Sequence, residues 1–377
     1  MNSRERVLAA LAHRTPDRTP CFEYVLLAPV ADEILGRPTF DYAGDCDWLA
    51  YAREIGWESA LKQYVVDRLD AAEILGHDLV YLRPCPVIAK DVNPHLKAGG
   101  GAVGAPDGRD DDDPVARLER RVEKSAAAGF VWPEDSFHVY ALMREEMDRR
   151  GLDLPVMAPC YFHGVWTDVD LMQTMLLDPD VARRHFVNAT RWAETRVAKY
   201  IDYGVDIVGV GGDFSGNRPL ISPESYRAFI MPEVRKVSDL LHAAGRFAVN
   251  ASDGDLWPVI DDFLVGSGVD GYLEIDSRAG MELRRLKASH GARITFFGNM
   301  DCGTVLSTAT PEEIRRETFE CLEAGSGNGG HVFCASNAIT ASVPLENYLA
   351  MVGAYRAFFG LDPVRIPLSL SNAEVPT

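Results

Sequence analysis

Five aspartates follow short apolar runs of the kind expected for buried strands: Asp213, Asp253, Asp255, Asp276 and Asp301. A carboxylate is costly to bury, whereas the end of a strand is an easy place to present it to a ligand. Such acids can bind a metal, bind a cation, or supply one proton donor or acceptor while neighbouring acids orient a substrate. The same side chains also cap helices, and Asp255, Asp253 and Asp276 each stand where a cap would serve. Both interpretations stay open.

Other polar side chains follow the same kind of apolar run. Ser336 and Asn337 come after the last run, and Cys160 and His163 come together after the third. A thiolate and an imidazole suit zinc, although two ligands make only half a site. The alternative to zinc binding is that a cysteine in an apolar strand is simply a small buried hydrophobic side chain.

Eight apolar runs could place these residues on one edge of a sheet. They span residues 21–27, 77–84, 154–162, 205–213, 246–255, 269–276, 293–301 and 330–337. Helical patterns alternate with them, including residues 179–204 and 311–325. Continuous apolar runs are typical of parallel strands buried on both faces, and eight such units favour an α/β fold of the (β/α)8 TIM-barrel type. We expect an N-terminal helical extension, with a helix over residues 3–12, and an insertion after the second strand.

A doubly wound nucleotide-binding sheet is the alternative fold. Its glycine signature should follow an early strand, and no GxGxxG stands there. The glycine-rich run at residues 209–216 has neither that spacing nor a P-loop lysine. The pattern therefore favours the barrel.

Composition excludes several classes of partner. The chain has 377 residues, of which 47% are hydrophobic, and a formal net charge of -18, which makes nucleic acid a poor partner. No apolar run is long enough for a membrane span, and the N-terminus lacks a secretory pattern. Seven cysteines without a CxxC pair favour a reducing cytoplasm. We expect one domain over residues 1–377, with a solvated loop at 99–114. Calcium binding by Asp110–Asp113 lacks the alternating ligand spacing that such a loop needs.

Four blocks of the chain resemble the uroporphyrinogen decarboxylase (URO-D) superfamily, which also contains cobalamin-linked coenzyme M methyltransferases. They are SRERVLAALAHRTPDRTP, with a DRxP segment; GVDIVGVGGDFSGNRPLISPESYRAFIMPEV; SDGDLWPVIDDFLVGSGVDGYLEID; and GHVFCASNAITASVPLENYLAMV. The resemblance covers nearly the whole chain. It implies a (β/α)8 barrel with its site at the carboxyl ends of the strands, and a homodimer as one arrangement found in the family.

Two departures from the family pattern bear on activity. The decarboxylases carry an arginine-bearing segment where this chain has residues 21–29, with Glu23 and no arginine. The thiol methyltransferases bind zinc through an H-x-C pair and a later cysteine, and the matching positions here are Ala251, Asp253 and Asn337. An acidic site without those arginines suits an eight-carboxylate tetrapyrrole poorly.

These observations lead to one main hypothesis and two alternatives. We expect an enzyme that transfers a methyl group from a small molecule, with a corrinoid (cobalamin) protein or cofactor as partner and zinc as a further expectation. The alternatives are a cofactor-independent decarboxylase (a carboxy-lyase) and a ligand-binding barrel without catalysis. The expected catalytic residues are Asp253, Asp276, Asp213 and Asn337. The expected substrate-binding residues are Glu23, His163, Trp166, Ser252 and Ser336, and the expected metal ligands are Asp253, Asp276, His163 and Cys160.

Overall fold

The computed structural model describes residues 1–41, 48–85 and 113–366 of the chain. By its internal contacts the chain divides into two compact units. Unit 1 comprises residues 1–82, 141–156 and 282–377, and unit 2 comprises residues 83–140 and 157–281. Each unit is described by itself, and the prediction of a single domain over residues 1–377 stays a prediction.

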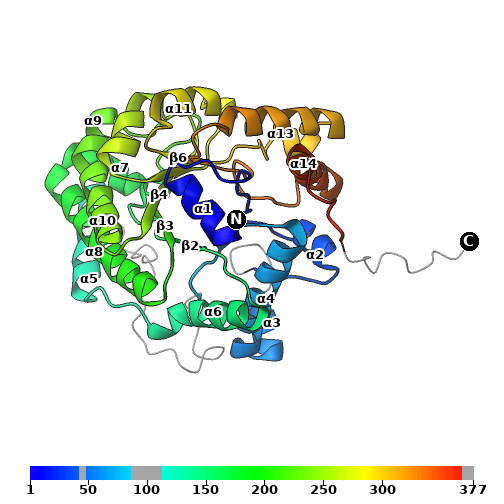
Figure 1. The fold of residues 1–377 in the computed structure, drawn as a ribbon. Helices are drawn as coiled ribbons and strands as arrows, with labels where there is room; N and C mark the ends of the chain where they lie inside the picture. The colour runs from blue at the N-terminus through cyan, green and yellow to red at the C-terminus, as the bar shows by residue number, and fades with distance from the viewer. Residues whose placement is uncertain (42–47, 86–112, 367–377) are drawn as a thin grey trace, which may run out of the picture. The chain divides into compact units, whose positions relative to one another are not determined.

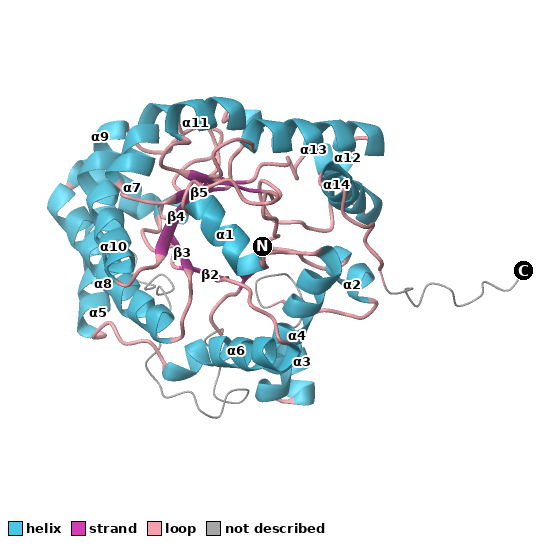
Figure 2. Cartoon of the chain, in the orientation of Figure 1, coloured by secondary structure: helices cyan, strands magenta, loops and turns pink. Residues whose placement is uncertain are grey.

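Unit 2 is built on four parallel strands that lie side by side in chain order (magenta in Figure 2). They are β2 (Val156–Pro159), β3 (Ile207–Gly211), β4 (Phe247–Ala251) and β5 (Gly271–Leu273). Each strand follows a helix or leads into one, and α10 packs on β3 and β4 (Figure 1). Parallel strands joined by helical crossovers are the unit from which α/β barrels are made.

The helical elements of unit 2 include one of the predicted helices. They are α5 (Pro114–Ala127), η1 (Glu134–Phe137), η2 (Val165–Thr167), α7 (Val169–Leu177), α8 (Pro179–Asp202), α9 (Pro223–Ser225), η3 (Tyr226–Ile230), α10 (Met231–Ala243), η4 (Trp257–Val259), η5 (Asp262–Gly266) and η6 (Ser277–Ala279). The predicted helix at 179–204 is confirmed as α8, which begins after the capping aspartate Asp178 and has proline in its first turn.

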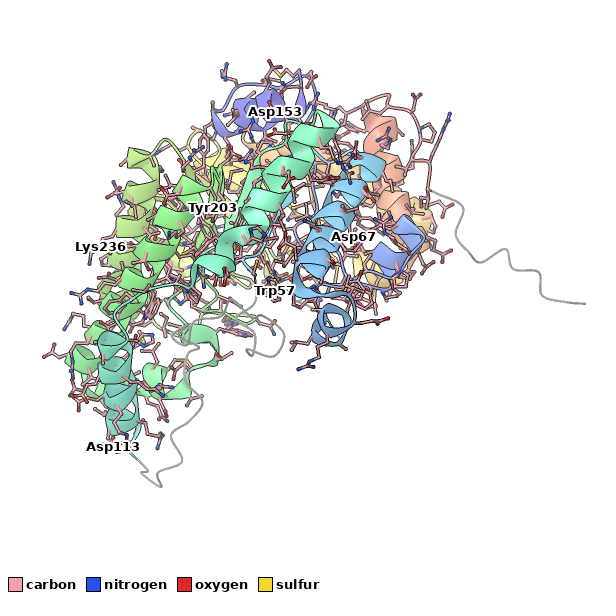
Figure 3. The ribbon with its side chains drawn as sticks, turned by 90° about the horizontal axis from the view of Figure 1, so that it is seen from below. Trp57, Asp67, Asp113, Asp153, Tyr203 and Lys236 are labelled. Carbon is pink, nitrogen blue, oxygen red and sulfur yellow. The ribbon has the colours of Figure 1, made fainter. Side chains whose placement is uncertain are left out.

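Unit 1 holds the shorter parallel arrangement of β6 (Thr295–Phe297) beside β7 (His331–Val332), together with β1 (Val80–Tyr81). Its helices are α1 (Ser3–Leu11), α2 (Val30–Leu35), α3 (Trp48–Ile55), α4 (Trp57–Leu75), most of α6 (His138–Arg150), α11 (Leu283–His290), α12 (Val305–Thr308), α13 (Pro311–Gly325) and α14 (Leu345–Phe358). The α4 helix carries Trp57 and Asp67, which are labelled in Figure 3. The predicted helices at 3–12 and 311–325 are confirmed as α1 and α13.

The first predicted strand, at residues 21–27, is wrong as a continuous strand. The segment makes two isolated parallel bridges, Cys21 with Phe333 and Leu26 with Ile339. Between these bridges the run itself bends at Tyr24, and the neighbouring segment bends at Ser336 and Asn337, so the ladder of backbone hydrogen bonds is interrupted. The run therefore lies beside the β7 segment without forming a strand.

The DRxP segment anchors the N-terminal helix of unit 1 through buried ion pairs. Asp78, which has no exposed surface, accepts hydrogen bonds from Arg6 Nη1 and Arg18 Nη1, each at 2.6 Å. Asp17 binds Arg6 Nε at 2.6 Å, and this guanidinium holds the pKa of the Asp17 carboxyl well below its usual range. The Arg18 guanidinium also donates to the hydroxyl of Tyr355 on α14. The segment is thus structural.

Most of the predicted loop at residues 99–114 lies outside the described residues, as do Asp110–Asp112. The described end of the segment is ordered by a cap, because the Asp113 carboxylate accepts a hydrogen bond from Val115 N at 3.0 Å as α5 begins. Among the described residues, no helix is both long enough and apolar enough to cross a membrane.

Candidate active site

Asp213 and Ser252 are the best-defined polar pair at the carboxyl ends of the unit 2 strands. Gly211 and Ala251, the last residues of β3 and β4, are register partners, so the residues that follow them lie side by side. Ser252 Oγ donates a hydrogen bond to Asp213 Oδ1 at 2.6 Å, and Ser215 N donates to the same oxygen at 3.3 Å. Burial nevertheless raises the pKa of the Asp213 carboxyl above its ordinary value. Asp213 is therefore a carboxyl group suited to holding and releasing a proton.

The glycine run before Asp213 makes room for side chains of neighbouring strands. A Cβ at Gly209 would lie 2.7 Å from the Tyr161 hydroxyl, and one at Gly211 would lie 2.3 Å from Asn250 Oδ1. Gly211 and Gly212 also have positive φ angles, of 73° and 123°, which favour glycine. The run thus lets the chain turn sharply between β3 and Asp213, and its function is steric.

The loops that follow β3 and β4 contact each other directly. A Cβ at Gly254 would lie 1.8 Å from the carbonyl oxygen of Gly216, so only glycine allows this approach. Asp255 N donates to Asn217 O at 3.2 Å, and the Asp255 carboxylate accepts from Trp257 N at 3.1 Å. The Asp255 carboxylate thus orders the turn before η4, whose N-cap residue is Leu256, and the capping interpretation of Asp255 stays a prediction.

Asp276, predicted to be catalytic and a metal ligand, acts as a helix cap. Its Oδ1 accepts hydrogen bonds from Arg278 N at 3.0 Å and from Ala279 N at 3.2 Å at the start of η6. Such hydrogen bonds from the backbone of the first turn are typical of a capping aspartate. A catalytic or metal role for Asp276 remains untested.

His163 and Cys160, from the end of β2, are both buried and engaged with the backbone. His163 Nε2 lies 2.7 Å from Gly212 O, and His163 Nδ1 accepts from Val165 N at 3.3 Å. Burial lowers the pKa of His163 to about 4, so the ring is neutral at pH 7. The Cys160 thiol lies 3.8 Å from Ala193 O, and burial raises its pKa to about 11. Neither group is prepared as a metal ligand.

The described residues do not fit a zinc centre. Among them, no group of three or more histidine, cysteine, aspartate or glutamate side chains is arranged to hold a metal. Both ring nitrogens of His163 already hydrogen-bond the backbone, whereas zinc needs a free ring nitrogen.

Unit 1 carries a second set of predicted residues near β7. Glu23 is 5% exposed, and its Oε2 accepts from Ala335 N at 3.4 Å, while Oε1 is buried without a hydrogen-bond partner among the described residues. Burial raises the pKa of Glu23 well above its ordinary value. The Tyr24 hydroxyl donates to Asn337 Oδ1 at 2.9 Å. Ser336 Oγ lies 3.6 Å from Cys302 Sγ.

The remaining predicted residues have simpler positions. Trp166 is 46% exposed and lies beside the β3 loop, where its ring comes within 3.6 Å of a Cβ placed on Gly216. The Asp301 carboxylate accepts from Gly303 N at 2.9 Å and so orders the turn before α12. Tyr24 and Tyr272 also belong to these two sets of polar contacts, but a tyrosine within an apolar run is typical of the hydrophobic core, so the sequence does not mark them as functional. The Tyr272 hydroxyl donates to Ser252 O at 3.2 Å.

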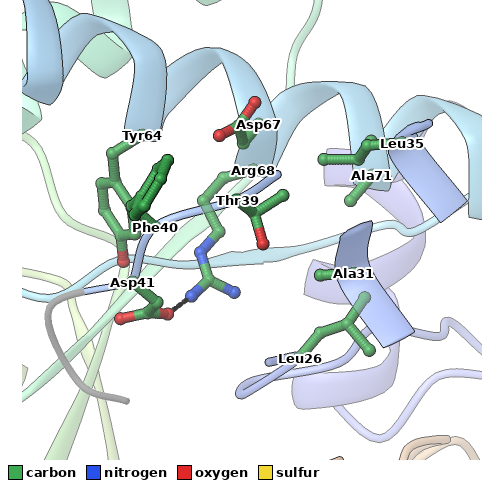
Figure 4. Close-up of a pocket in the computed structure, with 10 residues that line it drawn as sticks. All are labelled: Leu26, Ala31, Leu35, Thr39, Phe40, Asp41, Tyr64, Asp67, Arg68 and Ala71. Carbon is green, nitrogen blue, oxygen red and sulfur yellow. Dashed lines mark ion pairs between the residues drawn. The ribbon is translucent and has the colours of Figure 1, made fainter. Parts of the chain in front are cut away.

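A pocket in unit 1, shown in Figure 4, has an apolar floor and one charged wall. Its lining residues are Leu26, Ala31, Leu35, Thr39, Phe40, Asp41, Tyr64, Asp67, Arg68 and Ala71. Arg68 forms an ion pair with Asp41, and Arg37 binds Asp67 Oδ1 at 2.7 Å. Because its charged groups already bind arginines or carboxylates of this chain, the pocket is a weaker candidate than the Asp213 pair.

The comparisons with known proteins agree with the parallel α/β architecture. A solved structure of a methyltransferase from Methanosarcina mazei covers 95% of this chain and 99% of its own, with a TM-score of 0.64 and 19% identity. The protein thus has the (β/α)8-barrel fold. Residues 155–358, more than half of the chain, match the family described as uroporphyrinogen decarboxylase (URO-D). The chain belongs to this family.

Curated relatives carry both activities found in the family. A uroporphyrinogen decarboxylase from Coxiella burnetii is 27% identical over 190 residues, which are 48% of each chain. A methylated-thiol–coenzyme M methyltransferase from Methanosarcina mazei is 26% identical over 184 residues, 44% of this chain and 47% of its own. The match spans about half the length of these relatives. The family and the fold are thereby established, and the reaction is a separate question.

Proposed function

We propose that this protein is a methyltransferase that removes a methyl group from the oxygen, nitrogen or sulfur of a small molecule. The proposal rests on Asp213, because burial raises the pKa of this carboxyl group and it stands at the end of a barrel strand, where such barrels place their chemistry. The similarity to methyltransferases in sequence and in fold supports this reaction class. The absence of arginine from residues 21–29 also supports it, because a substrate with many carboxylates would need such cations for binding.

In this mechanism Asp213 acts as a general acid. A methyl group leaves oxygen or nitrogen easily only when the leaving atom receives a proton as the bond to carbon breaks. The proton comes from the Asp213 carboxyl, and the resulting carboxylate is stabilised by the Ser252 hydroxyl at 2.6 Å and by Ser215 N at 3.3 Å. The methyl acceptor implied by the family resemblance is a corrinoid held by a partner protein, which supplies the nucleophile. A homodimer and a cytoplasmic location belong to the same proposal.

Decarboxylation is the second candidate, because the family and several relatives carry that name. The same carboxyl could protonate carbon instead of a leaving heteroatom. Loss of carbon dioxide from uroporphyrinogen on incubation with the purified protein distinguishes the two reactions.

The test incubates the protein with reduced cobalamin and three classes of donor: methyl ethers, methylamines and methyl thioethers. We expect methylcobalamin and demethylated product from one class, and a loss of at least a hundredfold in the Asp213→Asn variant, in line with the usual effect of removing a general acid. Asp276→Asn is the matched control, since that carboxylate caps a helix, and it should retain activity. Equal rates for wild type and Asp213→Asn, or no turnover of any donor class, would refute the proposal.

A further inference from the structure

Ser252, which the sequence predicts to bind substrate, has a side chain that is buried and hydrogen-bonded within the protein. The side chain is fully buried, and its hydroxyl lies 2.6 Å from Asp213 Oδ1. Phe214 N donates to the same hydroxyl oxygen at 3.4 Å, which leaves the hydroxyl proton to point away from that amide. The alternative acceptor, Asp253 O, is more distant, at 3.4 Å. The hydroxyl proton is therefore directed at the Asp213 carboxylate.

The backbone of Ser252 is also fixed from β5. Tyr272 has no exposed surface, and its hydroxyl donates to Ser252 O at 3.2 Å. On the loop side, Gly254 allows the β4 loop to approach the β3 loop so closely that the Gly216 carbonyl occupies the place of a side chain. Ser252 is thus held from two directions, and its rotation away from Asp213 is restricted.

We propose that Ser252 is a positioning residue, which orients the Asp213 carboxyl and stabilises the carboxylate left after proton transfer, while Tyr272 holds Ser252 in place. This inference rests on the proposed function of Asp213. A buried carboxyl without such a donor would hold its proton more tightly and release it more slowly. Loss of the hydroxyl should therefore raise the pKa of Asp213 further.

Other titratable groups surround this pair and bear on its titration. Asp253 lies on the loop after β4. Tyr272 lies on β5 and is buried, and Glu274 follows β5 and is half-buried. After β2 stands His163, which contacts the residue before Asp213 through Gly212 O. Because His163 is neutral above about pH 4, it adds no positive charge near neutral pH.

The test is a titration of the whole protein labelled with ¹³C at the aspartate carboxyl carbons, followed by NMR. The Asp213 signal is assigned by its absence in Asp213→Asn. We expect Ser252→Ala to raise the pKa of Asp213 by about one unit or more, the size expected for a lost hydrogen bond to a charged group. Tyr272→Phe should shift it in the same direction by less. The matched control is Ser238→Ala, another fully buried serine, whose hydroxyl donates to Val234 O at 3.1 Å on α10.

The outcomes separate this inference from the proposed function. An unchanged Asp213 pKa in Ser252→Ala, or an equal shift in Ser238→Ala, overturns the positioning role whether or not the protein transfers methyl groups. A shifted pKa supports the role even if every donor class fails in the activity test. With an active donor, Ser252→Ala should also move the alkaline limb of the kcat profile to higher pH and lower its plateau, because a weaker acid stays protonated longer but donates less readily.

Discussion

The buried carboxylate of Asp78 offers a direct test of what holds the N-terminal helix of unit 1. Asp78 has no exposed surface and accepts hydrogen bonds from Arg6, from Arg18, from Cys21 N at 3.1 Å and from Ser3 Oγ at 2.9 Å. Replacing it by asparagine keeps the shape but removes the charge that both guanidinium groups face. Removing one partner of a buried ion pair costs about 3–5 kcal/mol, and we expect Asp78→Asn to lower the free energy of unfolding by that amount.

The structure supplies a matched control on the same helix. Arg4 binds Asp153 (labelled in Figure 3) through a 2.5 Å contact, but the Asp153 side chain is 55% exposed. Exposed pairs contribute about 1 kcal/mol or less, so Asp153→Asn should change little. A third variant, Asp78→Asn with Arg18→Met, should recover part of the loss, since it removes one unpaired buried charge.

The assay is urea unfolding followed by circular dichroism, with all variants under one set of conditions. Arg6 keeps a second carboxylate partner in Asp17, with 2.6 Å between Nε and Oδ1, so most of the loss is attributed to Arg18. Equal stability losses in Asp78→Asn and Asp153→Asn would refute the reasoning. The same conclusion would follow if the double variant were less stable than Asp78→Asn alone.

Four further predictions follow from the two units. Gly254→Ala should lower the free energy of unfolding by about 1–3 kcal/mol more than Gly280→Ala in chemical denaturation; both glycines have φ near +85°, but only the first would clash with a neighbouring backbone. The neutral His163 of the folded state binds fewer protons than the unfolded chain between about pH 6.5 and pH 4, so stability should fall as pH falls through this window, and His163→Gln should flatten that slope by up to about 1.4 kcal/mol per pH unit. The raised pKa of Glu23 acts in the opposite direction: its contribution to stability is complete below the ordinary carboxyl pKa of 4.5 and is lost as pH rises. Unfolding at a series of pH values from 4.5 upward should therefore show a smaller loss of stability in Glu23→Gln than in wild type. Asp276→Ala should cost about 1 kcal/mol in thermal unfolding as a lost cap while activity remains, and an inactive but stable variant would restore its catalytic assignment.

Much of the fold was predictable because helix signals are local. The capping threonine at 310, the proline after it and Glu313 define the start of α13 within four residues of sequence. Strand limits depend instead on the partner chain. Residues 21–27 are as apolar as a true strand, but the run bends at Tyr24 and the neighbouring segment bends at Ser336 and Asn337. The apolar pattern of 21–27 predicts neither bend.

The acids show more sharply why the site was only partly predictable. Asp213 and Asp276 both follow a parallel strand and both precede a turn, so their local sequences predict the same candidates. Both carboxylates accept a hydrogen bond from the backbone two residues on, Asp213 from Ser215 N and Asp276 from Arg278 N. Asp213 differs because β4 also places the Ser252 hydroxyl against it. A hydrogen bond from the backbone that follows a carboxylate forms wherever the strand lies. A hydrogen bond between two loops depends on how the two preceding strands are aligned. The Gly211–Ala251 register therefore brings Asp213 and Ser252 together, and the spacing of residues within either loop does not indicate this pairing.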